Sequence, residues 1–324
     1  MEKLLRIGTR ESQLAVWQAS LVKDQLAKKG FAAELVFIKS EGDIDLKTPL
    51  YEMGVQGVFT RSLDIALLND KIDLAVHSMK DVPTQLAKGI VQAAVLKRAS
   101  YKDLFVYKNE LPVISDELGF DNGQWLEMNK LITHHSLFIV ATSSIRRKAQ
   151  WLNRYPNHTI ENLRGNVNTR LRKVEESNWH GAIFAAAGLE RIDLRPEKSI
   201  ELDWMLPAPA QGAIMIVGKE NDNYALDACK HLDDAATAIC TKIERDFLKT
   251  LLGGCSTPIS AFAAIENDQL HFKGNILSID GKNKIEIEKT SILTEADELG
   301  VSAAHELLNN GGKEIADSIR NASK

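Results

Sequence analysis

Short apolar runs alternate with amphipathic stretches along the first part of the chain. The pattern predicts strands at residues 4–7, 33–38 and 72–76. Apolar residues at helical spacing predict helices at 13–29 and 59–68, between those strands. A β-α-β-α-β order favours parallel strands with helices on both faces of one sheet. We therefore expect an α/β fold.

The third predicted strand ends in a polar group that can support chemistry. Ser78, Lys80 and Asp81 supply a hydroxyl, an ammonium and a carboxylate just before Pro83. The proline restricts Val82 to an extended conformation, so we expect the polar group at a strand end and not in a helix. Ligands bind outside the carboxyl ends of strands in such sheets. The group could bind an anion and move a proton, although a motif this short, taken alone, is more often a solvated turn.

A strand-to-helix junction at residues 8–12 is a candidate anion site. Thr9 or Ser12 can cap the helix, and Gly30 can end it. Free N–H groups and the helix dipole favour a negative ligand there, and Arg10 adds a fork suited to a carboxylate. A capped helix without a ligand explains the same residues.

A second junction of this kind opens a strongly basic region. Thr142 and Ser144 follow the strand predicted at 138–141, and Glu161 is the only acid between residues 142 and 173. A solvated helix face normally mixes signs, so this cluster indicates a polyanionic ligand, and arginine binds planar carboxylates bidentately. We expect the charges of the first two arginines to face a cleft. The basic residues are Arg146, Arg147, Lys148, Arg154, Arg164, Arg170, Arg172 and Lys173.

The remaining pattern predicts two further units. Strands at 104–107 and 182–186 suggest a second lobe, and the Pro- and Gly-containing segment 206–212 reads as a hinge from which a strand at 213–217 returns to the first lobe. A helix at 235–252, followed by strands at 270–277 and 284–289 and then by helices at 295–308 and 313–322, predicts a small α+β unit. We expect domain 1 at 1–99 and 213–231, domain 2 at 100–206 and domain 3 at 235–324.

Composition limits the protein class. The 324 residues are 44% hydrophobic and 26% charged, as in soluble globular proteins, and the net charge of −4 argues against a general nucleic-acid binder. No secretory signal or membrane-spanning run is visible, so we expect no membrane partner and a cytoplasmic location. The three cysteines form neither a metal spacing nor a disulfide framework. Cys229 and Cys240 should be buried on apolar helical faces, whereas Cys255 should be exposed after two glycines.

Six stretches together resemble the porphobilinogen deaminase (hydroxymethylbilane synthase) family. They occur in the family's order across nearly the whole chain. The stretches are Thr9-Arg10-Glu11-Ser12, Val76-His77-Ser78-Met79-Lys80-Asp81-Val82-Pro83, Thr142-Ser143-Ser144-Ile145-Arg146-Arg147, Leu163-Arg164-Gly165-Asn166-Val167, Gln211-Gly212 and Gly253-Gly254-Cys255.

The resemblance implies two lobes similar to periplasmic binding proteins, with mixed sheets, and a small α+β C-terminal domain. It implies a monomer that holds a dipyrromethane cofactor through a thioether to Cys255 and binds no metal. Four porphobilinogen molecules are added in turn with loss of ammonia, and water releases the linear tetrapyrrole. Asp81 is the candidate catalytic carboxylate. The residues implied to bind the acetate and propionate side chains are Arg10, Ser12, Ser78, Lys80, Thr142, Ser144, Arg146, Arg147, Arg164, Gly165, Arg170, Arg191 and Gln211.

The sequence departs from the family pattern in three places, one of which is an elaboration at residues 110–135 that is longer than usual. The loop that usually reads Gly-Gly-Lys-Gly is Gly54-Val55-Gln56-Gly57, so Gln56 replaces the charge of a residue expected in a mobile lid. Ala210 stands where a glycine usually precedes Gln211. Two other hypotheses remain open from the residues: a non-catalytic anion-binding protein of the same shape, and an RNA-binding protein that uses the arginine cluster.

Overall fold

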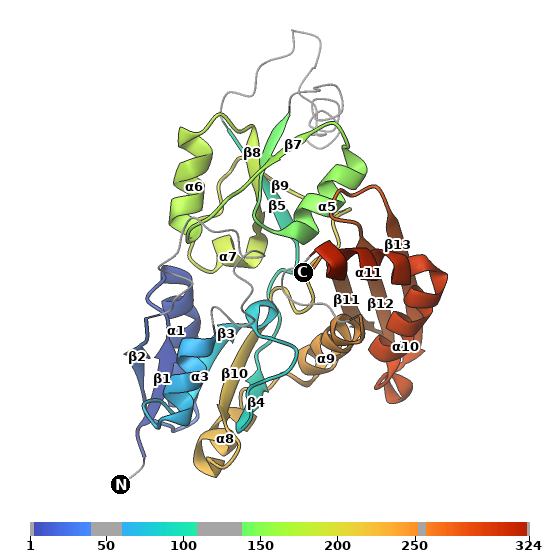
Figure 1. The fold of residues 1–324 in the computed structure, drawn as a ribbon. Helices are drawn as coiled ribbons and strands as arrows, with labels where there is room; N and C mark the ends of the chain where they lie inside the picture. The colour runs from blue at the N-terminus through green and yellow to red at the C-terminus, as the bar shows by residue number, and fades with distance from the viewer. Residues whose placement is uncertain (1–2, 40–59, 109–137, 252–256, 323–324) are drawn as a thin grey trace.

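The computed structural model describes residues 3–39, 60–108, 138–251 and 257–322. They form two lobes and a C-terminal α+β unit that lies beside both (Figure 1). Within the described ranges, no helix combines the length and apolarity that crossing a bilayer requires.

The first lobe is built on a mixed five-stranded sheet. In spatial order its strands are β2 (Ala33–Phe37), β1 (Leu5–Thr9), β3 (Leu74–Ser78), β10 (Ile214–Lys219) and β4 (Ile90–Val95). The strands β1, β2 and β3 run parallel, whereas β10 is antiparallel to both β3 and β4. The parallel start and the return of the chain at β10 are both as predicted.

Three helices cover the two faces of this sheet. The helices α1 (Gln13–Lys28) and α8 (Asn223–Lys230) share an apolar core with β1 and β3, and α3 (Arg61–Leu68) packs in the core on the other face. Ser12 caps α1 and Gly30 follows it at φ +88°, so the predicted boundaries are confirmed. The carboxyl ends of β1 and β3 face the second lobe (Figure 1).

The second lobe has its own mixed five-stranded sheet. Its spatial order is β7 (Thr159–Glu161), β6 (Ile139–Ala141), β8 (Gly181–Ala185), β5 (Asp103–Tyr107) and β9 (Ser199–Glu201). The strands β6, β7 and β8 are parallel, and β5 is antiparallel to β8 and β9.

Helices again cover both faces of the second sheet. Trp151 of α5 (Ile145–Arg154) and Tyr155, the residue that follows this helix, pack on one face. Residues of α6 (Val167–Glu176) and α7 (Ala186–Glu190) pack on the other face. The predicted α/β architecture with two mixed-sheet lobes is therefore confirmed.

The C-terminal unit has an antiparallel sheet of three strands, β11 (Ile259–Glu266), β12 (Gln269–Leu277) and β13 (Lys284–Ile292). Three helices pack on this sheet in one core: α9, α10 and α11, which span Ala235–Thr250, Leu299–Leu307 and Lys313–Ala322. This confirms the predicted α+β unit. The helix α9 also contacts the first lobe, and the sheet contacts α5, where Gln150 Nε2 donates to Ser260 Oγ at 3.1 Å.

Candidate active site

The polar group after β3 lies in a single 3-10 turn, η1 (Met79–Asp81). The Val82 amide closes the turn on the Met79 carbonyl at 3.1 Å, and the Met79 amide donates to Ala213 O at 3.0 Å. Val82 is extended, at φ −87° and ψ 128°, as Pro83 requires. The expectation that this group is not helical was wrong by this one turn, because Pro83 restricts only the residue directly before it.

Asp81 is half-buried at the end of β3 and faces positive charge. Its carboxylate makes no hydrogen bond or ion pair with any residue that the structure describes. Its charge acts on Lys80 in the same turn and on Arg170, which comes from α6 in the other lobe. The Asp81 carboxylate is therefore available to a ligand between the lobes.

Arg170 brings a buried cation to the same place. Its Nε is buried and lacks a hydrogen-bond partner in the described part of the chain. Burial and, to a smaller extent, the charge of Arg147 together lower the pKa of Arg170 to about 10, while the charge of Asp81 opposes the shift. At neutral pH the guanidinium stays charged, and its Nε–H needs an acceptor.

Lys80 links the turn to the hinge. Its ammonium donates to Gln211 Oε1 at 3.3 Å. Burial lowers the pKa of Lys80 to about 8, and the nearby charge of Arg147 acts in the same direction, against those of Asp81 and Asp103. A carboxylate ligand would relieve this repulsion by adding negative charge.

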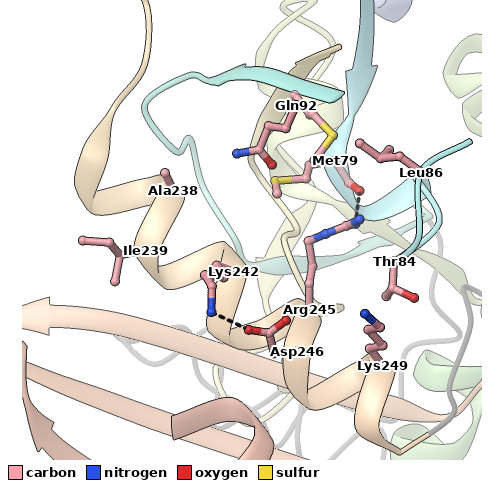
Figure 2. A pocket seen from close by; sticks show the side chains of 11 residues that line it. Met79, Thr84, Leu86, Gln92, Ala238, Ile239, Lys242, Arg245, Asp246 and Lys249 are labelled. Atoms are coloured by element: carbon pink, nitrogen blue, oxygen red, sulfur yellow. Dashed lines mark hydrogen bonds and ion pairs between the residues drawn. The ribbon is translucent and has the colours of Figure 1, made fainter. Parts of the chain in front are cut away.

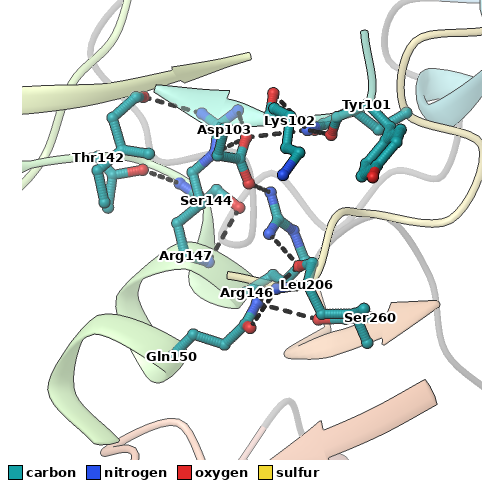
Figure 3. Close-up of polar contacts among 12 residues, drawn as sticks. Tyr101, Lys102, Asp103, Thr142, Ser144, Arg146, Arg147, Gln150, Leu206 and Ser260 are labelled. Atoms are coloured by element: carbon teal, nitrogen blue, oxygen red, sulfur yellow. Dashed lines mark hydrogen bonds and ion pairs between the residues drawn. The ribbon is translucent and has the colours of Figure 1, made fainter. Parts of the chain in front are cut away.

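Asp103, at the start of β5, is the centre of a buried polar network (Figure 3). The side chain is fully buried. Arg146 Nη2 donates to Oδ2 at 2.7 Å, and Arg147 Nη2 and Gln211 Nε2 donate to Oδ1 at 2.8 and 2.9 Å. Burial alone would raise the pKa of Asp103, but the charges of Arg146 and Arg147 outweigh it and lower the pKa to about 2.

This network corrects the expectation for Arg146 and Arg147. We expected two unpaired charges facing a cleft, but both side chains are buried and share Asp103. Arg146 also donates to Leu206 O at 2.7 Å, and Arg147 donates to Ile183 O at 2.9 Å. The sequence does not reveal Asp103 as their partner, because it lies about 40 residues before the arginines and outside the basic region at 142–173. A lone carboxylate heading an apolar strand was the available signal.

Hydroxyl and amide side chains cap the helices that carry these arginines. Ser144 Oγ accepts from Arg147 N at 3.4 Å, and Thr142 Oγ1 accepts from Ser144 N at 3.2 Å (Figure 3). At the start of α6, Asn166 is the cap, Gly165 has φ +116°, and Arg164 just before it is buried. The predicted hydroxyl cap of this helix is confirmed, and the capping residue is Ser144. The N-termini of α1 and α6 also meet, since Asn168 Nδ2 donates to Gln13 Oε1 at 2.9 Å.

The other predicted ligand residues lie at the edges of this cluster. Ser78 Oγ accepts from Gln18 Nε2 at 2.9 Å, and Arg10 lies near His77. Burial and, to a smaller extent, the charge of Arg10 together lower the pKa of His77 to about 3. The imidazole is therefore neutral at neutral pH. Arg191 donates to Gly212 O at 2.7 Å and lies 5.8 Å from the Trp17 ring centroid, between the two lobes.

Comparisons with known proteins agree with this geometry. A sequence model described as the dipyrromethane cofactor-binding domain of porphobilinogen deaminase matches residues 5–227, and one described as the C-terminal domain of that enzyme matches residues 238–309. The porphobilinogen deaminase of Chloroherpeton thalassium is 37% identical to the chain, with 99% of each chain covered. That of Trichlorobacter lovleyi is 38% identical, with 98% of this chain and 97% of its own length covered.

The chain belongs to the porphobilinogen deaminase family. It is therefore a transferase of tetrapyrrole biosynthesis, a hydroxymethylbilane synthase with a dipyrromethane cofactor. A solved structure of the methionine binding protein MetQ also aligns, with a TM-score of 0.42 and 14% identity, covering 72% of this chain and 92% of its own. That similarity is too low to add to the argument.

The described residues suit the carboxylates of a porphobilinogen deaminase cofactor. An acceptor is missing at the buried Nε of Arg170, and acetate and propionate groups supply acceptors of the right charge. The capped N-termini of α5 and α6 add free backbone N–H groups. The site thus fits a polyanion in charge and in hydrogen-bond direction.

The cysteines separate into two groups. Cys229 and Cys240 are buried as predicted, and burial raises their thiol pKa values to about 12 and about 11. Neither thiol is suited to act as a nucleophile at neutral pH. Cys255 and Gln56 lie outside the described residues, so the predictions for the anchor and the lid remain predictions.

Proposed function

We propose that Asp81 is the carboxylate that carries each condensation of porphobilinogen. The observation that supports this is its position: a half-buried carboxylate, without a hydrogen bond in the described structure, beside the charges of Lys80 and Arg170. The cations can bind the carboxylates of an anionic substrate, while the Asp81 carboxylate between them stabilises the positive charge that develops on that substrate.

The chemistry requires one group that faces two centres. When the substrate's C–N bond breaks, ammonia leaves and the methylene carbon becomes cationic, and Asp81 stabilises that charge. A C–C bond then forms, and Asp81 accepts the proton lost from the attacking pyrrole carbon and passes it to the ammonia or to water. The dipyrromethane, when bound, supplies the first pyrrole carbon to which a substrate is joined.

We further propose which residues hold the carboxylates of the growing chain. Arg170, Lys80 and Arg164 supply charge from both lobes, and Arg10 and Arg191 supply it at the edges. Arg146 and Arg147 act with part of their charge compensated by Asp103, so they contribute N–H donors and orientation more than net charge. The set also includes Ser12, Ser78, Thr142, Ser144, Gly165 and Gln211.

The reactivity of the thiols supports one attachment point for the dipyrromethane. We propose a thioether at Cys255, because burial disfavours thiolate formation at Cys229 and Cys240. Peptide mapping by mass spectrometry should place the dipyrromethane on a Cys255 peptide, and Cys255→Ser should abolish the covalent mass increment. An adduct on either buried cysteine would contradict the assignment.

We propose that the protein works as a cytoplasmic monomer on porphobilinogen, without nucleic acid or a membrane. The domain limits that we propose are 1–99 with 213–231, 100–206 and 235–324. The direct test of function is to add porphobilinogen to the purified protein and follow ammonia release with intact mass. Successive single-pyrrole increments support the proposal. Porphobilinogen left unconsumed by a cofactor-loaded protein would favour a non-catalytic anion-binding role.

A further inference from the structure

The turn that carries Asp81 is held by an arginine from the C-terminal unit. Arg245 is on α9, and its guanidinium reaches across to the first lobe (Figure 2). Its Nη1 donates to Val82 O at 2.9 Å and to Met79 O at 3.4 Å, and its Nη2 donates to Pro83 O at 2.6 Å. The Arg245 side chain thus donates hydrogen bonds to three backbone carbonyls, one before Asp81 and two after it.

The geometry of this contact is specific to arginine. The Arg245 side chain is 9% exposed and adjoins a pocket of about 370 Å³ between α9 and the segment after β3. A planar fork can bind several carbonyl oxygens at once, whereas an ammonium is a point charge. Charge-assisted hydrogen bonds of this kind are about twice as strong as neutral ones. The backbone of η1 is therefore fixed relative to α9 as well as to its own sheet.

The neighbouring residue on α9 fixes the hinge. Glu244 is fully buried, and its carboxylate accepts hydrogen bonds from Arg98 Nη1 at 2.6 Å and from the Ala210 amide at 2.6 Å. One turn of α9 therefore holds both the catalytic turn and the segment that joins the lobes. The same helix ends at Thr250, and Cys255 follows five positions later in the sequence.

We propose that Arg245 is a positioning residue for Asp81, which fixes the carboxylate relative to the helix that leads to the cofactor cysteine. The inference rests on the proposed role of Asp81. Without Arg245, three carbonyls lose a donor and the turn is held mainly by its amide contact to Ala213. A displacement of about 1 Å at a reacting group can cost about 100-fold in rate.

The variants to compare are Arg245→Met, Arg245→Lys and, as a matched control, Lys249→Met. Lys249 lines the same pocket one turn further along α9 but is exposed and makes no hydrogen bond or ion pair in the described structure. For each protein, the cofactor-loaded fraction is counted by intact mass. The measured quantities are kcat per loaded molecule, KM, and amide hydrogen exchange in a peptide covering residues 79–83.

We expect Arg245→Met to lower kcat about 10- to 100-fold with a KM change below about threefold. Arg245→Lys should restore part of the rate, because one cation can still reach one carbonyl. Exchange in the peptide should rise at least tenfold in Arg245→Met and stay at the wild-type rate in Lys249→Met. If Arg245→Met does not accumulate as folded protein, Arg245→Lys against Lys249→Met decides the question.

An unchanged kcat per loaded molecule in Arg245→Lys, with unchanged exchange at residues 79–83, would overturn the inference. A fall in Tm and in loaded fraction with kcat retained would also overturn it, because it would show a purely structural role. Wild-type protein in the same assay separates this outcome from failure of the proposed function. If wild type is loaded and consumes porphobilinogen, only the role of Arg245 is in question.

Discussion

The carboxylate of Asp103 accepts hydrogen bonds from three side chains, and two guanidinium groups compensate its charge. This arrangement changes what the arginines at 146 and 147 are expected to do. Removal of one partner of a buried pair leaves an uncompensated buried charge, which costs about 3–5 kcal/mol. The arginines therefore contribute to the free energy of unfolding, in addition to the role in ligand binding that we propose for them.

Asp103→Asn should lower the free energy of unfolding by about 3–5 kcal/mol, because two buried cations lose their counter-charge. Urea denaturation at pH 7 measures this. The control is Asp203→Asn, which removes the exposed partner of Lys102 and should cost less than about 1 kcal/mol. Equal effects of the two substitutions would show that the buried network contributes no more than a surface pair.

Acid should remove the same stabilisation. Because the pKa of Asp103 is lowered to about 2 in the folded protein, its contribution is present above the unfolded value of about 3.9 and is lost as the pH falls through 2. Between pH 4 and pH 2, wild type should therefore lose more stability than Asp103→Asn. Parallel loss in both proteins would contradict the assignment to Asp103.

Because of Lys80, binding of the substrate should weaken as the pH rises above neutral. Since its pKa is about 8, its ammonium loses its charge between pH 7 and pH 9, and the attraction to substrate carboxylates falls with it. We expect KM for porphobilinogen to rise several-fold over this range in wild type. Lys80→Arg stays charged and should show a flat KM. A rise of equal size in both proteins would assign the pH dependence to another group.

The roles of single residues could be predicted from the sequence where they depend on neighbours within a short motif. The cap at Ser144 and the burial of Cys229 follow from neighbours close in the chain. The partner of Arg147 did not follow, because Asp103 is far away in sequence and only the sheet brings it under α5. The contact of Arg245 with the turn at Asp81 has the same origin.

The hinge shows how single backbone conformations shape an element. Ala210 has φ +62° and Gly212 has φ +90°, so two residues of this short segment lie in the left-handed region. A Cβ at position 212 would lie 2.7 Å from the carbonyl oxygens of Ala99 and Ser100. A glycine is therefore required at position 212. At position 210, where the family pattern usually has a glycine, the left-handed conformation strains the alanine backbone.

Ala210→Gly should stabilise the protein by about 0.5–1 kcal/mol, because relief of a left-handed alanine, worth about 1–2 kcal/mol, exceeds the added entropy of the unfolded chain. Thermal or urea unfolding measures this. The opposite substitution, Gly212→Ala, should cost about 2–4 kcal/mol through strain and overlap. A destabilised Ala210→Gly would mean that the strain at position 210 is not released by glycine.

The elements that the sequence revealed are those with clear periodicity. The strands β2 and β5 and the helices α1 and α9 match their predicted ranges within about two residues. The strand β11 was not predicted, because three of the eight residues in Ile-Ser-Ala-Phe-Ala-Ala-Ile-Glu are alanine, which is depleted in strands and weakens the alternation. The strands β7 and β9 have three residues each, too few for a period to appear.

Glu244 joins the C-terminal unit to the rest of the molecule. Its carboxylate accepts from Arg98 and Ala210 near the hinge and from the Ala263 amide in β11 at 2.8 Å. One buried group thus connects the first lobe, the hinge and the C-terminal unit. The unfolding of the C-terminal unit should be coupled to that of the lobes through it.

Glu244→Gln should lower stability by about 3–5 kcal/mol and separate the unfolding of the C-terminal unit from that of the lobes. Residues 235–324 contain no tryptophan, so tryptophan fluorescence reports on the lobes alone, while circular dichroism reports on the whole chain. The two transitions should coincide in wild type and diverge in the variant. Lys273→Met, which breaks a surface pair with Glu288, is the control. Coincident curves in Glu244→Gln would exclude this coupling.

The most direct test of the whole account is the rate of ammonia release in a single turnover by Asp81→Asn. Cofactor-loaded protein is mixed with one equivalent of porphobilinogen and quenched over time, and substrate binding is measured on the same sample. We expect the rate of ammonia release to fall about 100-fold or more, because the asparagine can neither stabilise the cationic methylene carbon nor accept the proton of the attacking pyrrole. The affinity for porphobilinogen should change only a few-fold. A rate within threefold of wild type in a fully loaded Asp81→Asn protein would contradict this role of Asp81.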